Sequence, residues 1–122
     1  MMIVENIGDV LVRGFTGYGQ RVHGNVILVF NPELIRPYFV KDQLIVLTSC
    51  DESYLPLIKE ASGIILQNHI DDQTSETNLL EAAKELNKSV IVRADTAANI
   101  LKQGQLITLD PEKALIYKGV VL

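Results

Sequence analysis

The stretch SGIILQNHIDDQTSETNLLEAAKELNKSVIV, which runs from Ser62 to Val92, decides the fold of this chain. Its first residues, Ser62 to Leu66, form a short isoleucine-rich run that predicts a strand buried on both faces. A helical pattern follows from Thr77 to Asn87, and Val90 to Val92 predicts a second strand. The stretch therefore predicts a βαβ unit, in which two parallel strands are joined through a helix.

The predicted helix is amphipathic, and the loop before it is polar. Leu79, Ala83 and Leu86 recur at positions i, i+4 and i+7 and predict the buried face of the helix. The loop from His69 to Ser75 offers several side chains that can cap a helix N-terminus. These candidates are Asp71, Asp72, Thr74 and Ser75. We expect function in this loop, because free backbone N–H groups and the helix dipole converge there.

Length and composition indicate a single domain spanning residues 1–122. Hydrophobic residues make up 48% of the chain, enough for a core of Ile, Leu, Val and Ala. The formal charge of -4, without a Lys/Arg cluster, argues against binding to nucleic acid or to an anionic membrane. No apolar run approaches the roughly 18 residues that span a bilayer, and the start lacks the features of a signal peptide. We therefore expect a cytoplasmic protein, and the single cysteine, Cys50, fits a reducing compartment.

Short apolar runs elsewhere predict further strands. They are Met2 to Val4, Val10 to Arg13, Val22 to Phe30, Leu44 to Thr48, Leu106 to Leu109 and Ala114 to Lys118. Two more helices are expected, one that Asp51 or Ser53 caps and another that Asp95 or Thr96 caps. Seven or eight strands with about three helices favour an α/β fold of the β/β/α sandwich type, built on a mixed sheet.

The segment GFTGYG, from Gly14 to Gly19, is rich in glycine like many nucleotide-binding loops. Its glycine spacing matches neither the dinucleotide fingerprint nor the P-loop, and a strand rather than a helix follows it. We therefore predict a wide turn between two strands, with glycine chosen because it tolerates positive φ angles.

Three stretches together resemble one known family. They are IGDVLVRGFTGYG at Ile7 to Gly19, YLPLIKEASGII at Tyr54 to Ile65, and NILKQGQLITLDPEKALIYKG at Asn99 to Gly119. Their content and order are similar to the swivelling phosphohistidine domain of phosphoenolpyruvate (PEP)-utilising enzymes. The similarity is greatest to the extra C-terminal domain that some bacterial pyruvate kinases carry. The resemblance implies a swivelling β/β/α sandwich over nearly the whole chain.

The resemblance also implies where the chemistry of the family lies. The family motif is Gly-Gly-x-Thr-Ser-His-Ala-Ala, whose histidine stands at a helix N-terminus and accepts a phosphoryl group. Matching AAKEL at Ala82 to Leu86 puts the histidine position on Asn78, whereas matching Thr74 and Ser75 to the Thr-Ser of the motif puts it on Glu76. Both registers stay open, and neither side chain can form a phosphohistidine. Thr74, Ser75, Glu76 and Asn78 are called the phosphoacceptor region below.

Other residues near this region carry groups that could take part in chemistry. His69 is the candidate for a relocated phosphoacceptor. Asp71, Asp72 and Glu76 offer hard oxygen ligands, but carboxylates near a helix N-terminus more often complement the helix dipole, so no metal site is predicted. No cofactor is predicted either. Cys50 has no histidine near it in the sequence and is predicted to be a small buried or surface thiol rather than a nucleophile.

The resemblance implies a non-catalytic structural or regulatory domain, whose partner is a pyruvate kinase body or another protein domain. Two alternatives stay open: a phosphotransfer domain that uses His69, and a sensor that binds an anion or phosphometabolite at the N-terminus of the helix. Pyruvate kinase activity is not expected, because the family's catalytic site belongs to a barrel domain that these 122 residues lack. Exposed apolar residues such as Tyr38 and Phe39 leave room for a protein interface, homo-oligomers included.

Overall fold

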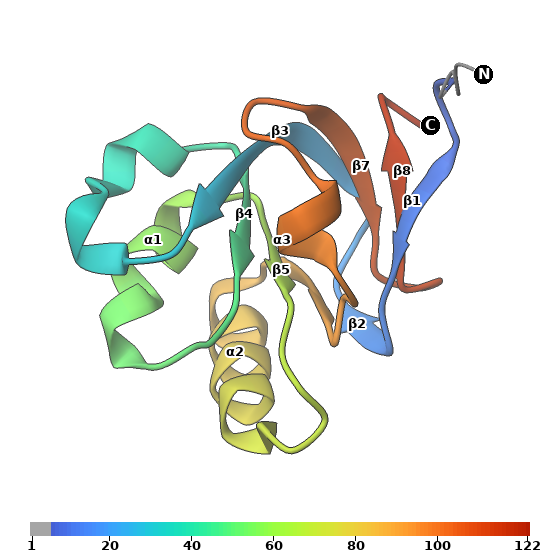
Figure 1. Ribbon diagram of the computed structural model, residues 1–122. Coiled ribbons are helices and arrows are strands. Elements are labelled where there is room, and N and C mark those ends of the chain that lie inside the picture. The colour runs from blue at the N-terminus through green and yellow to red at the C-terminus, as the bar shows by residue number, and fades with distance from the viewer. Residues whose placement is uncertain (1–5) are drawn as a thin grey trace.

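Strands dominate the structure. The computed structural model describes residues 6–122, in which eight strands form one mixed sheet and three α-helices pack beside it (Figure 1). The strands are β1 (Val10–Arg13), β2 (Thr16–Tyr18), β3 (Val22–Val29), β4 (Leu44–Leu47), β5 (Gly63–Leu66), β6 (Ser89–Val92), β7 (Leu106–Asp110) and β8 (Leu115–Lys118). The α-helices are α1 (Leu55–Glu60), α2 (Gln73–Leu86) and α3 (Ala97–Ile100), and the 3-10 helices are η1 (Pro32–Leu34), η2 (Pro37–Val40) and η3 (Glu52–Tyr54). The predicted numbers of strands and helices are confirmed.

Four parallel strands form the centre of the sheet. The strand order is β1-β8-β7-β3-β4-β5-β6-β2, in which β3 to β6 run parallel and the other neighbours pair antiparallel. The unit β5-α2-β6 is the βαβ unit that the sequence predicts. Strand β3 is shared, because Val22–Asn25 pair with β7 whereas Val26–Val29 pair with β4. The sheet therefore divides into two halves that meet at β3.

Alternate residues of the central strands enter two different cores. In β4, Ile45 and Leu47 pack into one core together with Leu79 of α2. Leu44 of the same strand packs into the other core, together with Ile107 of β7. Successive side chains of a strand point to opposite faces, so α1 and α2 cover one face of the parallel half while β1, β7, β8 and α3 cover the other (Figure 1). The predicted β/β/α sandwich is confirmed.

The predicted wide turn from Gly14 to Gly19 is wrong. This segment contains β2, which pairs antiparallel with β6 at the edge of the sheet. A Cβ atom on Gly17 would lie 2.5 Å from the carbonyl oxygen of Val90 and 2.8 Å from that of Pro111. Glycine is therefore needed at this position for the close approach of backbones, and a positive φ angle is adopted at Gly19 instead.

Helix α2 begins at Gln73, four residues before the predicted start at Thr77. Asp72, one of the four cap candidates, is the N-cap, and its carboxylate accepts the backbone N–H of Ser75. The apolar periodicity could not indicate this start, because the first turn carries polar side chains. The predicted end is confirmed, since Asn87 is the C-cap in the left-handed conformation, with φ of 56°.

Most of the other expected helices and strands are present in the structure. Asp51 caps η3, which leads into α1, and the two predicted C-terminal strands, β7 and β8, pair antiparallel. Thr96 precedes α3 as expected, but its side chain makes no capping hydrogen bond. The predicted strand from Met2 to Val4 lies outside the described residues. Among residues 6–122, no helix combines the length and the apolar character that a membrane crossing requires.

Candidate functional site

The parallel strands β4, β5 and β6 each lead into a loop at the same edge of the sheet. This edge, at the carboxyl ends of the strands, is where α/β proteins commonly bind ligands. The loop after β4 contains Cys50, the loop after β5 contains Asn68, and Arg93 follows β6 directly. The first turns of α2 contact these loops through hydrogen bonds. Those turns contain the phosphoacceptor region, which the sequence predicts to lie partly in a loop and which the structure places entirely in the helix.

Ser75 ties the first turn of α2 to the loop after β4. Its side chain is buried, and its Oγ accepts the backbone N–H of Cys50 at 3.0 Å. The same Oγ donates to the Asp72 carboxylate at 2.6 Å, and that carboxylate also accepts the Ser75 N–H at 3.1 Å. A carboxylate of the chain therefore occupies the helix N-terminus, where a bound anion would otherwise find N–H donors and the positive end of the dipole.

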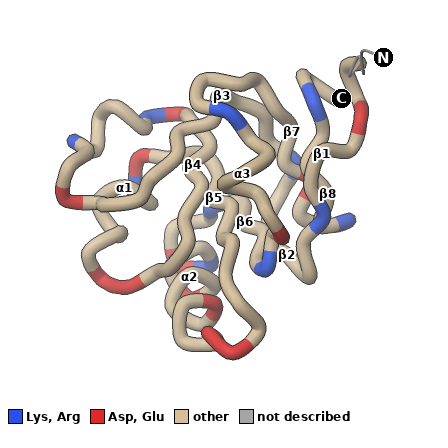
Figure 2. Tube along the Cα trace, in the orientation of Figure 1, with Lys and Arg blue, Asp and Glu red and all other residues tan. Residues whose placement is uncertain are grey.

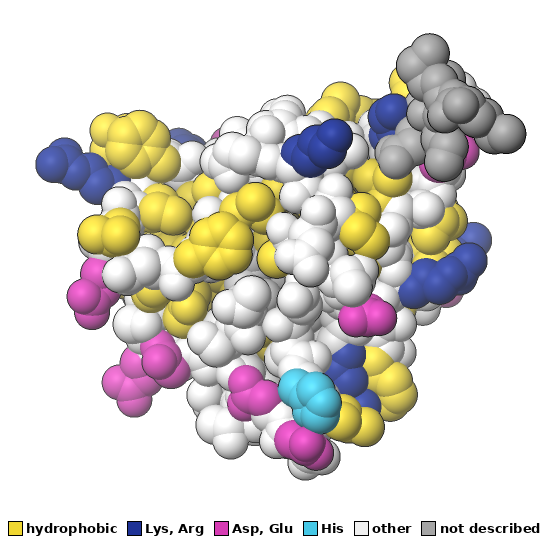
Figure 3. All heavy atoms as spheres, viewed as in Figure 1, with side chains coloured by type: hydrophobic (Ala, Val, Ile, Leu, Met, Phe, Trp, Pro, Cys, Tyr) yellow, Lys and Arg dark blue, Asp and Glu magenta, His cyan; other side chains and the backbone are white. Residues whose placement is uncertain are grey.

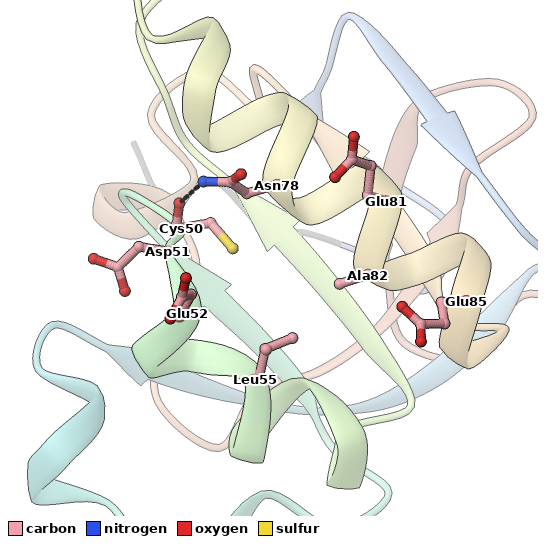
Figure 4. Close-up of a pocket in the computed structure, with 8 residues that line it drawn as sticks. All are labelled: Cys50, Asp51, Glu52, Leu55, Asn78, Glu81, Ala82 and Glu85. Atoms are coloured by element: carbon pink, nitrogen blue, oxygen red, sulfur yellow. Dashed lines mark hydrogen bonds between the residues drawn. The ribbon is translucent and has the colours of Figure 1, made fainter.

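Asn78, the histidine position in one register, has a structural contact. Its Nδ2 donates to the carbonyl oxygen of Cys50 at 3.1 Å (Figure 4). Helix α2 therefore satisfies both the N–H and the C=O of Cys50, through Ser75 and Asn78. These two bonds hold the helix against the loop after β4.

Glu76, the histidine position in the other register, is the centre of an ion-pair network. Its carboxylate accepts hydrogen bonds from Nε and Nη2 of Arg93, the second at 3.2 Å, and from Nδ2 of Asn68 at 2.9 Å. The side chains of Glu76 and Arg93 are only 12% and 21% exposed. The hydrogen bond from Arg93 is the main reason that the pKa of Glu76 lies below its usual range, although burial works in the opposite direction. Glu76 is therefore a carboxylate that holds this arginine in place.

Asn68 and Phe15 complete this network. The Asn68 side chain accepts the backbone N–H of Arg93 at 2.9 Å and donates to the Asp72 carbonyl at 3.1 Å, so it joins β6 to the start of α2. The centroid of the Phe15 ring lies 4.1 Å from the guanidinium carbon of Arg93, which makes this a cation–π contact. Arg93 itself adopts a left-handed backbone conformation, with φ of 51°. The surrounding contacts therefore stabilise a conformation that non-glycine residues seldom adopt.

A hollow of about 270 Å³ opens between α2 and the start of α1 (Figure 4). Its lining consists of Cys50, Asp51, Glu52, Leu55, Asn78, Glu81, Ala82 and Glu85. Four of these eight residues carry carboxylates. The hollow therefore has a negative potential, which disfavours a phosphate and its negative charges at Asn78.

The Cys50 thiol has low reactivity in this environment. Burial, with smaller contributions from the carboxylates of Asp51 and Asp72, raises the pKa of its thiol to about 12. A nucleophilic cysteine requires a thiolate, so the thiol at neutral pH is a poor nucleophile. Of the two predicted settings, a buried or a surface thiol, the structure shows the buried one, since Cys50 is 4% exposed.

The structure keeps His69 away from the helix. Its side chain is 74% exposed in the loop after β5, and three residues lie between it and the first residue of α2. Its Nδ1 accepts the Asp71 backbone N–H at 3.2 Å and lies 3.2 Å from the Asp71 carboxylate. Asp71, Asp72 and Glu76 thus have separate partners, and within residues 6–122 no group of three or more His, Cys, Asp or Glu side chains is placed to hold a metal ion.

Sequence reasoning missed Asn68, Arg93 and Phe15. Asn68 and Arg93 are polar residues that follow closely on two buried, neighbouring strands of the predicted βαβ unit. The carboxyl ends of parallel strands lie at one edge of a sheet, so their position along the chain could have indicated that they meet. The contact of Phe15 depends on the pairing of β2 with β6, which the sequence pattern did not predict.

Comparison with known proteins identifies the same family that the sequence resembles. The family model described as "PEP-utilising enzyme, mobile domain" matches residues 39–114. Pyruvate kinase of Geobacillus stearothermophilus is 30% identical over 124 aligned residues, which cover 98% of this chain and 20% of the kinase. Phosphoenolpyruvate synthase of Aeropyrum pernix is 28% identical over 114 residues, which cover 93% of this chain and 13% of the synthase. The chain thus spans a fifth or less of the length of these curated relatives.

Solved structures show the same fold at low identity. A chain from the crystal structure of Thermococcus kodakaraensis aconitase X aligns with a TM-score of 0.58 and 16% identity, over 89% of this chain and 96% of that chain. The solution structure of a UPF0107 protein aligns with a TM-score of 0.56 and 14% identity, over 94% and 98% of the two chains. This fold therefore also occurs in separate chains of nearly the same length.

Proposed function

The chain belongs to the family of PEP-utilising enzyme mobile domains, and from this premise we propose that it is a non-catalytic structural or regulatory domain of the pyruvate kinase type. The observation that carries the proposal is the role of the two residues that stand at the family's histidine position. Glu76 is ion-paired with Arg93, and Asn78 is hydrogen-bonded to the backbone of Cys50. In either register, a residue that stabilises the fold stands where a phosphoacceptor is expected.

The charges around the phosphoacceptor region support the same conclusion. Asp72 occupies the N-terminus of α2, and the carboxylates of Asp51, Glu52, Glu81 and Glu85 line the hollow beside Asn78. A phosphoryl group or an anionic metabolite would have to approach these charges. We therefore favour the non-catalytic domain over the two alternative functions, a sensor of anions and a phosphotransfer domain.

The remaining features concern the partner and the compartment. The relatives devote four-fifths or more of their length to polypeptide outside this domain. We propose that a pyruvate kinase body, in the same chain or another, is what the domain binds.

The buried, unpaired Cys50 fits a reducing compartment, so we place the protein in the cytoplasm.

The full 122-residue chain is expected to associate with the pyruvate kinase of the same organism. Size-exclusion chromatography with light scattering, at micromolar concentrations of both proteins, should show a shared peak whose mass equals their sum. The phosphoacceptor variant Asn78→Ala should co-elute as wild type does, because the proposed role requires no phosphoryl transfer. Separate elution of the two wild-type proteins at every concentration, together with a gene whose upstream sequence encodes no kinase in the same reading frame, would contradict the proposal.

A further inference from the structure

Strand β1 is an edge strand with one unpaired side. It begins the strand order of the sheet and, within residues 6–122, pairs with β8 alone. Figure 1 shows β1 along the right side of the molecule. The unpaired side of an edge strand offers N–H and C=O groups to which another strand can add. β1 is therefore a candidate surface for strand addition.

The hydrogen bonds around β1 show which of its backbone groups face outward. The C=O of Asp9 and the N–H of Gly14, which flank β1, both bond to the backbone of residues 114–118, the segment that contains β8. Bonded and non-bonded residues alternate along an antiparallel pair, so Val10 and Arg13, next to these bonds, direct their own N–H and C=O groups away from β8. No other group of the described residues is hydrogen-bonded to these outward groups.

A groove runs beside this edge. It has a volume of about 310 Å³ and is lined by the whole of β1 together with Asp95, Thr96 and Ile100. Val10 and Ile100 are 39% and 42% exposed. Figure 3 shows hydrophobic side chains and a basic side chain over β1, on the right of the view. The edge is therefore accessible, with apolar side chains next to the outward backbone groups.

Opposite charges stand at the two ends of β1. Asp9 directly precedes the strand and Arg13 ends it, and both are exposed (Figure 2). Arg13 has no ion-pair partner among residues 6–122. If two copies of β1 pair antiparallel, with Val10 of each copy opposite Arg13 of the other, a two-fold axis passes between Leu11 and Val12.

This arrangement places Arg13 of each copy beside Asp9 of the other copy, so opposite charges meet at both ends of the contact. A parallel arrangement would instead bring the two arginines together. A second copy of the chain always carries the matching order of charges, whereas an unrelated strand would carry it only by coincidence. The charge pattern thus assigns the edge to a second copy.

We propose that β1 pairs antiparallel with β1 of a second copy, so that the two sheets join across a two-fold axis. Backbone hydrogen bonds link Val10 of each copy with Arg13 of the other. The register shift between Val10 and Val12, a β-bulge, keeps the contact short, so the dimer is weak, at the low end of interface sizes. The inference does not depend on the proposed function, because β1 makes none of the hydrogen bonds of the phosphoacceptor region.

Sedimentation equilibrium of the full chain, from about 10 μM to about 1 mM, measures the dimerisation. The salt concentration is about 0.15 M, because each copy carries a formal charge of -4. Val10→Pro removes an outward N–H donor but no hydrogen bond to β8, and Arg13→Asp brings two carboxylates together at each end of the contact. Each variant is expected to weaken dimerisation at least tenfold. Arg36→Asp makes the same change of charge at an exposed arginine away from β1, and it should stay within twofold of wild type.

A mixture of two variants identifies the partner and its direction. Asp9→Arg and Arg13→Asp each place like charges at both ends of the contact, so each protein alone should be a monomer. When the two are mixed, the opposite charges are restored at both ends, and a heterodimer should form. Thermal unfolding curves of all variants are recorded, because the Asp9 carboxylate also accepts the backbone N–H of Asn6.

Three results would overturn the proposal. The first is a wild-type chain that stays monomeric at every concentration. The second is a dimer that Val10→Pro and Arg13→Asp leave unchanged, which would place the contact elsewhere on the chain. The third is a folded pair of charge variants that forms no heterodimer, which would exclude the antiparallel contact.

Discussion

Replacing Gly17 with alanine is expected to lower the free energy of unfolding by about 3 kcal/mol, the upper end of the usual cost of overpacking. The added Cβ would lie 2.5 Å from the carbonyl oxygen of Val90, 2.8 Å from that of Pro111 and 2.9 Å from the Pro111 Cα. All three are backbone atoms in or beside strands, so no side chain can rotate to make room. Strand β2 would have to move off β6, and Phe15, which precedes β2, would lose its place over Arg93.

Urea unfolding followed by far-UV circular dichroism measures this change. Gly104→Ala is the matched control, because a Cβ there would meet open space although φ is +82°. It should cost about 1 kcal/mol, the strain of a left-handed alanine. If Gly17→Ala proved no more costly than Gly104→Ala, the close packing of β2 on β6 would be refuted.

Replacing Glu76 with glutamine is expected to lower the free energy of unfolding by about 2 kcal/mol at pH 7, the usual worth of hydrogen bonds to a charged group. The change keeps the shape of the side chain but removes the charge that Arg93 faces. Asn68 would also lose a charged acceptor for its Nδ2 donor. Chemical denaturation of wild type and variant, measured in parallel, gives the difference.

The difference between wild type and Glu76→Gln should depend on pH in one direction. The hydrogen bond from Arg93 holds the pKa of Glu76 in the folded protein below the ordinary value of 4.5. The stabilisation is therefore fully present above about pH 4.5, where the carboxylate is ionised in both states, and it is lost as the pH falls through the folded-state pKa. The two unfolding curves should approach each other in acid.

Glu81→Gln is the control for this series. Glu81 is an exposed carboxylate on the same helix, so its removal should change stability by no more than about 0.5 kcal/mol at any pH. A difference between wild type and Glu76→Gln that stays constant from pH 7 to pH 3 would show that the ion pair does not contribute as described.

The sequence predicted the parts of the fold that depend on local periodicity. Strands such as β5 and β6, buried on both faces, and the amphipathic part of α2 leave a direct pattern in the chain. Strand β2 left no such pattern, because it is short, contains glycine and is defined by its pairing with β6. The first turn of α2 was missed because Asp72 and polar residues, not an apolar face, define its start.

The site was predicted only in part for a related reason. The phosphoacceptor region follows from a resemblance alone, and the structure places its residues in the first turns of α2, beside the loop after β4. The partners of its residues come from elements distant in the sequence. Arg93 lies 17 residues from Glu76, and Cys50 lies 28 residues from Asn78. Only the packing of α2 across the ends of β4 and β6 brings these pairs together.

The central claim, that this domain carries no phosphoryl group, is tested most directly by labelling. The full chain is incubated with PEP labelled in its phosphoryl group and with the phosphotransfer enzymes of the same organism, while a phosphohistidine protein in the same mixture serves as the positive control. We predict no acid-labile, base-stable label on the chain. His23→Ala, in β3, changes the other of the two histidines and is the control. Label on wild type that persists in His23→Ala and disappears in His69→Ala would contradict the claim and assign phosphotransfer to His69.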